Sequence, residues 1–223
     1  MELKTEGIVL KNYNKGENDN ITVIFTREEG KVLVSSKSTR KIKSKLKFCI
    51  ELFSLNKYFL VRKNKGSKYY TLAQAEPLRT FESVRNSLRK IGFSYLVVDL
   101  LNKFLQLEDP HVELFDITKE VLHVVDGGAY SNIENVEAFF KLKLLSLAGF
   151  NLSDDSAFLS SSDAVKKVKE TVSEVKKSDN PSKLDIEYSL IREANMLIDS
   201  YIIHQLGEDV ASLRMLGGIR KDD

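Results

Sequence analysis

Up to about residue 76, hydrophobic residues occur in short clusters separated by polar, turn-forming residues. The clusters are rich in Val, Ile, Phe and Tyr, and the separators include Asn14-Lys15-Gly16 and Asn64-Lys65-Gly66-Ser67. This pattern predicts β-strands near residues 6–13, 20–26, 31–37, 50–62 and 68–75. The second and third flank a Glu29-Gly30 turn, so we expect them to pair as a hairpin.

After Pro77 the hydrophobic spacing becomes helical. One predicted face carries residues three and four positions apart, namely Leu88, Ile91, Tyr95, Val98 and Leu101. Asp109-Pro110 is typical of an N-cap followed by the first helical residue, and Asp126-Gly127-Gly128 is typical of a helix end.

Three more helices are expected in the rest of the chain. The first follows a Ser131–Glu134 capping box, ends near Gly149 and is apolar on most sides, which predicts a central position. The second, near 162–177, is rich in Lys and Glu and should lie on the surface. The third, near 183–206, has one apolar face formed by Leu190, Ile191, Ala194, Leu197, Ile198 and Tyr201. Residues 151–162 form the least structured stretch.

The change of period predicts an α+β protein with two domains. Five short strands without a long helix between them favour a small closed barrel, for which the OB-fold is the natural candidate. We expect an OB-fold domain at residues 1–78 and a helical domain at residues 79–223.

Composition indicates an ordinary globular protein. The 223 residues are 42% hydrophobic and 30% charged, and the single cysteine, Cys49, excludes an internal disulfide and suits a reducing compartment. The first residues have no secretory signal, and no apolar run approaches the ~20 residues of a membrane span. These features predict a soluble cytoplasmic protein.

The two parts of the chain differ sharply in charge. Residues 1–80 hold 17 Lys and Arg against 8 Asp and Glu, whereas the remaining residues hold 17 against 24. An excess of positive charge in one part predicts a polyanionic partner, most often nucleic acid. The acidic part would repel DNA and suits protein partners.

The densest positive charge lies in residues 37–47, with six basic residues in eleven. If this segment is extended, Lys41, Lys43, Lys45 and Lys47 share one face at a spacing of about 6.6 Å, which would let them follow a phosphate backbone. If the segment is a loop, the lysines supply positive potential but are not aligned with successive phosphates. A solvated loop that only keeps the protein soluble is the ordinary alternative. The predicted DNA-binding residues are Lys11, Lys37, Arg40, Lys41, Lys43, Lys45, Lys47, Arg62 and Lys63, with Lys15, Lys65 and Lys68 adding charge nearby.

Aromatic residues are interleaved with these cations. Most, such as Phe25, Phe53 and Phe59, fit a barrel core. Tyr13, Tyr58 and Tyr69 have a polar end that can remain in water, so we expect these rings to stack on bases, with Tyr13 and Tyr58 taken into the predicted site.

Signatures of catalysis are absent from the sequence. The three histidines are scattered, no phosphate-binding loop or nucleophile elbow is present, and Cys49 has no histidine near it in the sequence. The sequence therefore predicts a protein that is not an enzyme, with no metal and no cofactor.

Several segments, in order, resemble the RecO family of bacterial recombination mediators. They are G-I-V-L-K-N-Y-N-K-G-E-N-D (7–19), I-F-T-R-E-E-G-K-V (24–32), K-S-K-L-K (43–47), E-L-F-S-L (51–55) and Y-T-L-A-Q-A-E (70–76). A looser resemblance continues to Ser212-Leu213-Arg214.

The resemblance implies a non-catalytic DNA-repair factor. Such proteins bind single- and double-stranded DNA, anneal complementary strands, and work with RecR to load RecA onto DNA coated by single-strand-binding protein (SSB). They also bind the acidic, apolar C-terminal tail of SSB through the helical domain. On this basis we expect the tail at the helix that carries Phe139, Phe140, Lys141, Lys143 and Leu144, although aromatic residues in such a helix are often core.

Two features depart from the family pattern. Many members carry two C-x-x-C pairs in the helical domain, whereas residues 151–162 here hold no cysteine, so no zinc is expected. The end of the chain, Val210–Arg214, is less basic than usual, which predicts a weaker C-terminal contribution to DNA binding. The residues alone also leave open an RNA- or ribosome-associated barrel protein, and a scaffold whose lysines serve only solubility.

Overall fold

The computed structural model describes residues 1–15, 19–37, 46–64, 66–150, 152 and 163–219. Compactness divides the chain into two units, which we call the barrel unit (Met1–Glu82 with Ser94–Lys119) and the helical unit (Ser83–Phe93 with Glu120–Asp223). The middle of the chain contributes to both, so a domain boundary at residue 78 stays a prediction. No helix among the described residues is long and apolar enough to cross a bilayer.

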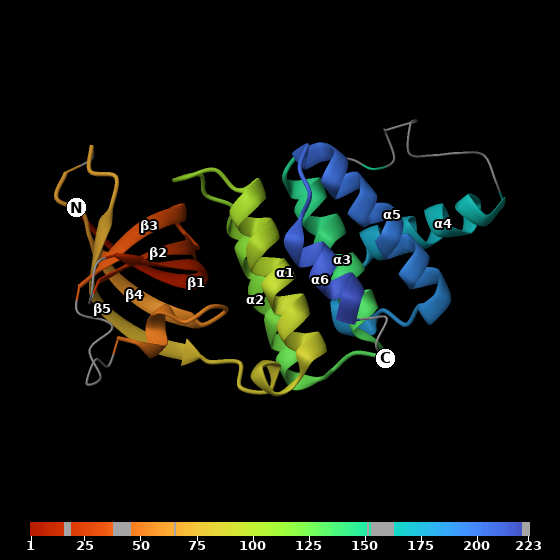
Figure 1. Ribbon diagram of the computed structural model, residues 1–223, viewed down its shortest axis with the longest axis horizontal. Helices are drawn as coiled ribbons and strands as arrows, with labels where there is room; N and C mark the ends of the chain where they lie inside the picture. Colours follow the sequence, from red (N-terminus) through yellow and green to blue (C-terminus); the bar gives the residue numbers. More distant parts are fainter. Residues whose placement is uncertain (16–18, 38–45, 65, 151, 153–162, 220–223) are drawn as a thin grey trace. The chain divides into compact units, whose positions relative to one another are not determined.

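In the described part of the barrel unit, five strands close a barrel in the order β1-β2-β3-β5-β4 (Figure 1). The strands are β1 (Glu2–Lys15), β2 (Asp19–Thr26), β3 (Gly30–Ser36), β4 (Leu55–Val61) and β5 (Tyr70–Arg79). All pairs are antiparallel except β3 with β5, which pair in parallel at Val34 with Tyr70 and Ser35 with Thr71. The α+β class and the barrel are therefore confirmed.

Buried and more exposed residues alternate along the strands, and the buried ones form the barrel core. In β3 every second residue is buried, as expected for a strand with one face toward a core. The core gathers side chains from all five strands and from the short 3₁₀ helix Phe48–Ile50, namely Leu3, Val9, Ile24, Val32, Val34, Cys49, Ile50, Tyr58, Leu60, Tyr70 and Leu72. The predicted strand near 50–62 thus begins only at Leu55.

The β2–β3 hairpin closes as the Glu29-Gly30 sequence predicts. Gly30 has a φ of 68°, in the left-handed region that favours glycine. A Cβ at Gly30 would lie 1.9 Å from the carbonyl oxygen of Asp109, so this position admits no side chain. Nearby, the Glu108 amide donates to the Lys31 carbonyl at 2.9 Å. The residues before α2 therefore run directly along the start of β3.

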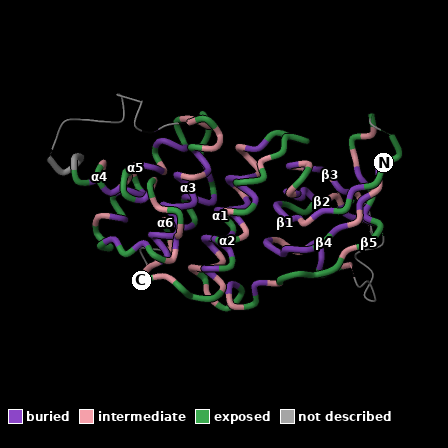
Figure 2. The backbone as a smooth tube through the Cα atoms, turned by 180° about the vertical axis from the view of Figure 1, so that it is seen from behind, coloured by how far each residue is buried: buried purple, intermediate pink, exposed green. Residues whose placement is uncertain are grey.

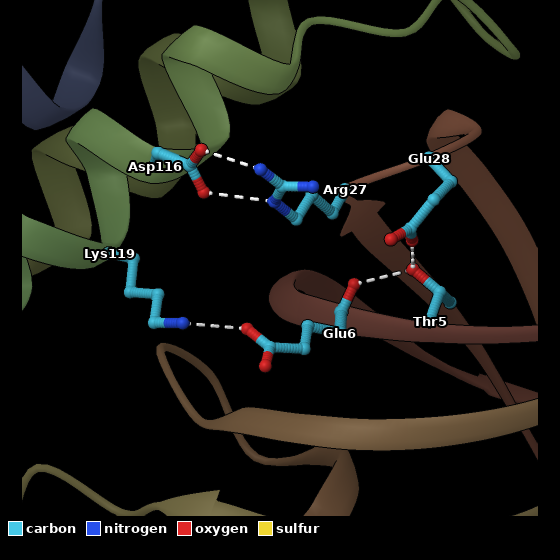
Figure 3. A network of polar contacts seen from close by, with 6 residues as sticks. All are labelled: Thr5, Glu6, Arg27, Glu28, Asp116 and Lys119. Carbon is cyan, nitrogen blue, oxygen red and sulfur yellow. Dashed lines mark hydrogen bonds and ion pairs between the residues drawn. The ribbon is translucent and has the colours of Figure 1, made fainter.

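Two helical segments pack on the barrel within this unit: residues 94–104 of α1 (Leu88–Phe104) and residues 112–119 of α2 (Val112–Gly127). The rings of Phe25 and Phe115 meet edge to face at 5.4 Å. Figure 3 shows the polar contacts beside them: Arg27 donates twice to Asp116, at 3.0 and 2.9 Å, and Lys119 Nζ lies 2.7 Å from Glu6.

The start of α2 and the buried face of α1 differ from the sequence-based expectation. Helix α2 begins at Val112, and the Phe115 amide donates to the His111 carbonyl, so Pro110 precedes the helix. On α1, Leu88 and Tyr95 are 67% and 38% exposed, whereas Phe93, Leu96 and Val97 are buried. Val98 and Leu101 are buried as predicted, so the buried surface of α1 is wider than the predicted face and leaves out Leu88 and Tyr95.

In the helical unit, α3 (Ile133–Leu147) packs against α4 (Asp163–Lys177) and α5 (Tyr188–Leu206). Twelve residues of α3 are buried, which confirms its central position, and Figure 2 shows the buried stretch. Its N-cap is Asn132, whose side chain accepts from the Asn135 amide, and not Ser131. A further helix, α6 (Ala211–Ile219), was not expected from the sequence.

Candidate nucleic-acid interface

The end of β1 presents alternating cations and an aromatic ring. Beyond a bulge between Val9 and Lys11, β1 pairs with β2 up to Lys15 opposite Asp19. Lys11, Tyr13 and Lys15 are all exposed, and they share one face of this ribbon because side chains alternate along a strand. The intervening Asn12 is fixed differently, since its Nδ2 donates to the Ile50 carbonyl at 3.2 Å.

Cation–π contacts join this ribbon to the residues before β5. Lys11 Nζ lies 5.0 Å from the Tyr13 ring centroid, and Lys15 Nζ lies 5.6 Å from the Tyr69 centroid. Lys68 Nζ lies 5.8 Å from the same Tyr69 ring. Cations at such distances are attracted to ring faces, which holds the rings among positive charges.

Strand register places other lysines at the same end of the barrel. The end of β1, the start of β2, the end of β3, the start of β5 and the end of β4 follow one another around the barrel. Lys37 directly follows β3, and Lys63 lies just beyond β4; both are exposed. We call this set the cationic end: the exposed Lys11, Tyr13, Lys15, Lys37, Lys63 and Lys68, and the partly exposed Tyr69.

The cationic end combines the two chemical features that bind single-stranded nucleic acid without base specificity. Lysines attract phosphates, and aromatic rings offer stacking platforms to bases. Lys15, Lys68 and Tyr69 were outside the predicted site, although their types and positions were visible in the sequence. Strand register was the missing information, because only strand pairing brings the end of β1 close to Lys68 and Tyr69.

Four of the predicted lysine-rich positions, Arg40, Lys41, Lys43 and Lys45, lie outside the described residues. Lys47, at the end of the same run, is exposed and precedes Phe48, which is 60% exposed. The alternatives for this run, an extended segment with its lysines on one face or a loop, therefore stay open.

Tyr58 is a correction to the predicted site. It is 2% exposed, and its hydroxyl donates to the Cys49 carbonyl at 2.6 Å while accepting from Asn56 Nδ2 at 2.8 Å. Burial raises the pKa of this hydroxyl. The expectation that its polar end stays in water is wrong, because Tyr58 alternates into the barrel interior, and the ring has no face for a base.

Arg62 is a second correction. It is 5% exposed, its guanidinium lies 4.5 Å from the Tyr70 ring centroid, and it forms an ion pair with Glu108. Its backbone amide also donates to the Met1 carbonyl at 2.8 Å. This arginine stabilises the barrel and does not present a cation at the surface.

The residues expected to hold the SSB tail are mostly core. Phe139, Phe140, Lys141 and Leu144 are each at most 2% exposed. Lys141 Nζ lies 2.6 Å from Glu137 and forms a second ion pair with Asp199, so its charge is satisfied inside the protein. Lys143 alone of the predicted set is partly exposed, 5.5 Å from the Phe139 ring and 3.7 Å from Asp179. The predicted tail position is therefore corrected.

A cavity of about 370 Å³ lies beside these residues in the helical unit. Leucines of α3 form one side, α4 forms another, and Lys169 and Lys176 lie among the lining residues, which are Leu142, Leu145, Ser146, Phe150, Leu152, Lys169, Val172, Ser173, Lys176 and Leu197. An apolar hollow with two lysines suits a peptide that carries apolar and acidic side chains.

Nothing in the described residues resembles a metal site, since no three His, Cys, Asp or Glu side chains come together there. The stretch that replaces the family's cysteine pairs lies almost wholly outside the described residues.

Comparison with known proteins agrees with this architecture. The family described as "Recombination protein O N terminal" matches residues 1–81, and "Recombination protein O C terminal" matches residues 85–166. Proteins named "DNA repair protein RecO" are similar to the chain: 30% identical over 146 residues in Halalkalibacterium halodurans, and 30% over 149 residues in Alkaliphilus metalliredigens. These matches cover 66% and 67% of this chain but 56% and 59% of the relatives, so the chain spans less than two thirds of their length.

Proposed function

The chain belongs to the RecO family, and from this premise we propose that it is a non-catalytic DNA-repair protein that binds DNA strands at the cationic end of its barrel. The observation that carries the proposal is the approach of Lys15 and Lys68 to the same Tyr69 ring, which puts a stacking ring beside phosphate-binding cations.

The proposed activity is annealing of complementary strands. Two DNA strands repel each other, and lysines that neutralise phosphates lower this repulsion. Lysine contacts to phosphates carry no sequence information, so a bound strand can shift until its bases find their complements. Such a process makes and breaks no covalent bond, which is consistent with a protein that is not an enzyme.

The proposed partners follow from the family: RecR, and RecA that is loaded onto SSB-coated single-stranded DNA. The SSB tail is acidic and apolar, and the cavity with Lys169 and Lys176 fits that chemistry better than the buried residues of α3. We place the protein in the bacterial cytoplasm, at the nucleoid when it acts.

Annealing of complementary strands precoated with SSB tests the proposal, with intact SSB compared to SSB without its C-terminal tail. The pair Lys15→Gln and Lys68→Gln should slow annealing of both coated and bare strands. The pair Lys4→Gln and Lys57→Gln removes the same charge elsewhere on the barrel and serves as the control. Lys169→Glu with Lys176→Glu should slow annealing only when the tail is present.

Equal rates for the two barrel pairs would reject the cationic end as the DNA surface. A strong preference for structured RNA over a matched DNA strand, measured by competition, would instead favour an RNA-binding protein. If the protein shows no salt-sensitive binding to any nucleic acid, the result would favour the scaffold, whose lysines serve only solubility.

A further inference from the structure

A small cavity lies next to the cationic end, between β1 and α1 of the barrel unit. Its volume is about 240 Å³, and its lining comes from β1, from Leu52 and from one face of α1: Leu10, Lys11, Asn12, Leu52, Tyr95, Val98, Asp99 and Asn102. Pockets for drug-sized molecules measure roughly 300–1,000 Å³, so this one suits a single small ring system.

Hydrogen bonds hold both walls of this cavity. On the helix side, Lys31 Nζ donates to the Asn102 carbonyl at 2.6 Å, and burial lowers the pKa of this lysine. On the strand side, Asn12 donates to the Ile50 carbonyl and its Oδ1 accepts from Thr22 at 3.4 Å. Both walls of the cavity are therefore fixed by contacts within the barrel unit.

The lining offers a ring and a hydrogen-bonding edge. Leu10, Leu52 and Val98 supply apolar surface, and the Tyr95 ring is 38% exposed, so one face can accept a stacked ring. The side-chain amide of Asn102 makes no hydrogen bond to any described residue and combines a donor with an acceptor. An asparagine amide of this kind pairs with the N6 and N7 edge of adenine.

The charges indicate which part of a nucleotide enters. Asp99 lines the cavity, and its negative charge repels phosphate. Lys11 lies both in this lining and in the cationic end, so a phosphate bound by Lys11 leaves its base close to the cavity.

We propose that this cavity receives one unstacked nucleobase of the bound strand, with Tyr95 stacking on it and Asn102 pairing with its edge. Adenine binds more tightly than thymine, because its N6 and N7 edge offers the donor and the acceptor that the Asn102 amide pairs with. This inference rests on the proposed function, because it requires a strand at the cationic end. It adds a base-selective contact to a surface that otherwise binds any sequence.

The test is the affinity for a 15-residue oligothymidine compared with the same strand carrying one central adenine. The single adenine should tighten binding about fivefold or more, because one bidentate base contact supplies that discrimination. Asn102→Ala should abolish the preference, because it weakens binding of the adenine-carrying strand more than binding of oligothymidine. Tyr95→Leu should weaken binding of both strands, because it removes the stacking ring.

Asn86→Ala, which truncates an exposed asparagine elsewhere, is the matched control and should keep the preference. Thermal unfolding of Asn102→Ala and Asn102→Asp checks that both variants fold, and Asn102→Asp should also lose the preference because it lacks the amide donor. Equal affinities of the unaltered protein for the two strands, or a preference that survives both Asn102 changes, would overturn the inference. Absence of any salt-dependent binding to either strand would instead reject the proposed function, and the inference with it.

Discussion

Lys15 and Tyr69 meet across the barrel end, with the lysine Nζ 5.6 Å from the ring centroid, although they lie far apart in the sequence. Lys68 approaches the same ring at 5.8 Å. Lys15 ends β1 and Lys68 precedes β5, so the two lysines reach the same Tyr69 ring only because the strands close into a barrel.

Replacing Tyr69 by Leu should weaken single-stranded DNA binding while leaving the salt dependence nearly unchanged. Stacking on a ring contributes about 1–3 kcal/mol per base, which corresponds to roughly 5- to 150-fold in affinity. Fluorescence anisotropy over a salt series measures both quantities. Tyr188→Leu, which removes an exposed tyrosine from α5, should have no effect; an equal effect of both changes would argue against the ring as a stacking platform.

Replacing Lys41, Lys43, Lys45 and Lys47 by Ala should make DNA binding less sensitive to salt. If about five phosphates are neutralised, log K falls with log[salt] at a slope near −3.5, and each lost contact makes the slope shallower by about 0.7. The quadruple Ala variant of Lys167, Lys169, Lys176 and Lys177 in α4 removes equal charge from the helical unit. An unchanged slope and annealing rate in the first variant would show that these lysines serve only solubility.

Replacing Gly30 by Ala should destabilise the barrel by about 2 kcal/mol or more, as measured by urea unfolding. The positive φ disfavours a side chain, and the new Cβ would meet the Asp109 carbonyl. At Gly127 a Cβ meets nothing within 4 Å, so Gly127→Ala should change stability by less than about 1 kcal/mol. Similar effects at both glycines would contradict the close approach of residues 108–109 to β3.

Replacing Lys141 by Met should destabilise the helical unit by about 3–5 kcal/mol, because Glu137 and Asp199 would lose the buried cation that they share. Lys143→Met, at a partly exposed position, should cost less than about 1 kcal/mol. Urea unfolding distinguishes the two. A stable Lys141→Met variant that loses binding to the SSB tail peptide would restore the original expectation of a tail site on α3.

Alkaline pH should destabilise the protein, and Tyr58 should account for part of the loss. Burial raises the pKa of Tyr58 above the ordinary value of 10.0 and that of Cys49 above 9.0. Above these ordinary values the unfolded chain loses protons that the folded chain keeps, so the free energy of unfolding falls by about 1.4 kcal/mol per pH unit for each group. The stabilisation is fully present below pH 9.

Urea unfolding at pH 8, 9.5 and 10.5 measures this decline. Tyr58→Phe removes one titrating group, so its stability should start lower, because two hydrogen bonds are lost, and then decline less steeply with pH. A parallel decline in both proteins would mean that the Tyr58 hydroxyl is accessible to solvent.

Local patterns along the chain were sufficient to predict the barrel, the central α3 and the surface position of α4. Alternation and helical spacing are properties of a few neighbouring residues, so one segment reveals them. The start of α2 was less predictable, because Asp109-Pro110 has the residue types of a helix start while contacts to Gly30 and Lys31 hold these residues outside the helix.

The candidate site shows the same difference between what local sequence predicts and what tertiary contacts decide. Sequence alone determined that the cations of this protein are concentrated before residue 80 and that no catalytic motif accompanies them, because charge and residue type are local facts. Only the tertiary structure decided which of these residues reach water. Tyr58 lies in the barrel core, Arg62 is buried against Tyr70 and Glu108, and Tyr69 lies near Lys15 at the barrel end, because strand register and closure determine the direction of each side chain.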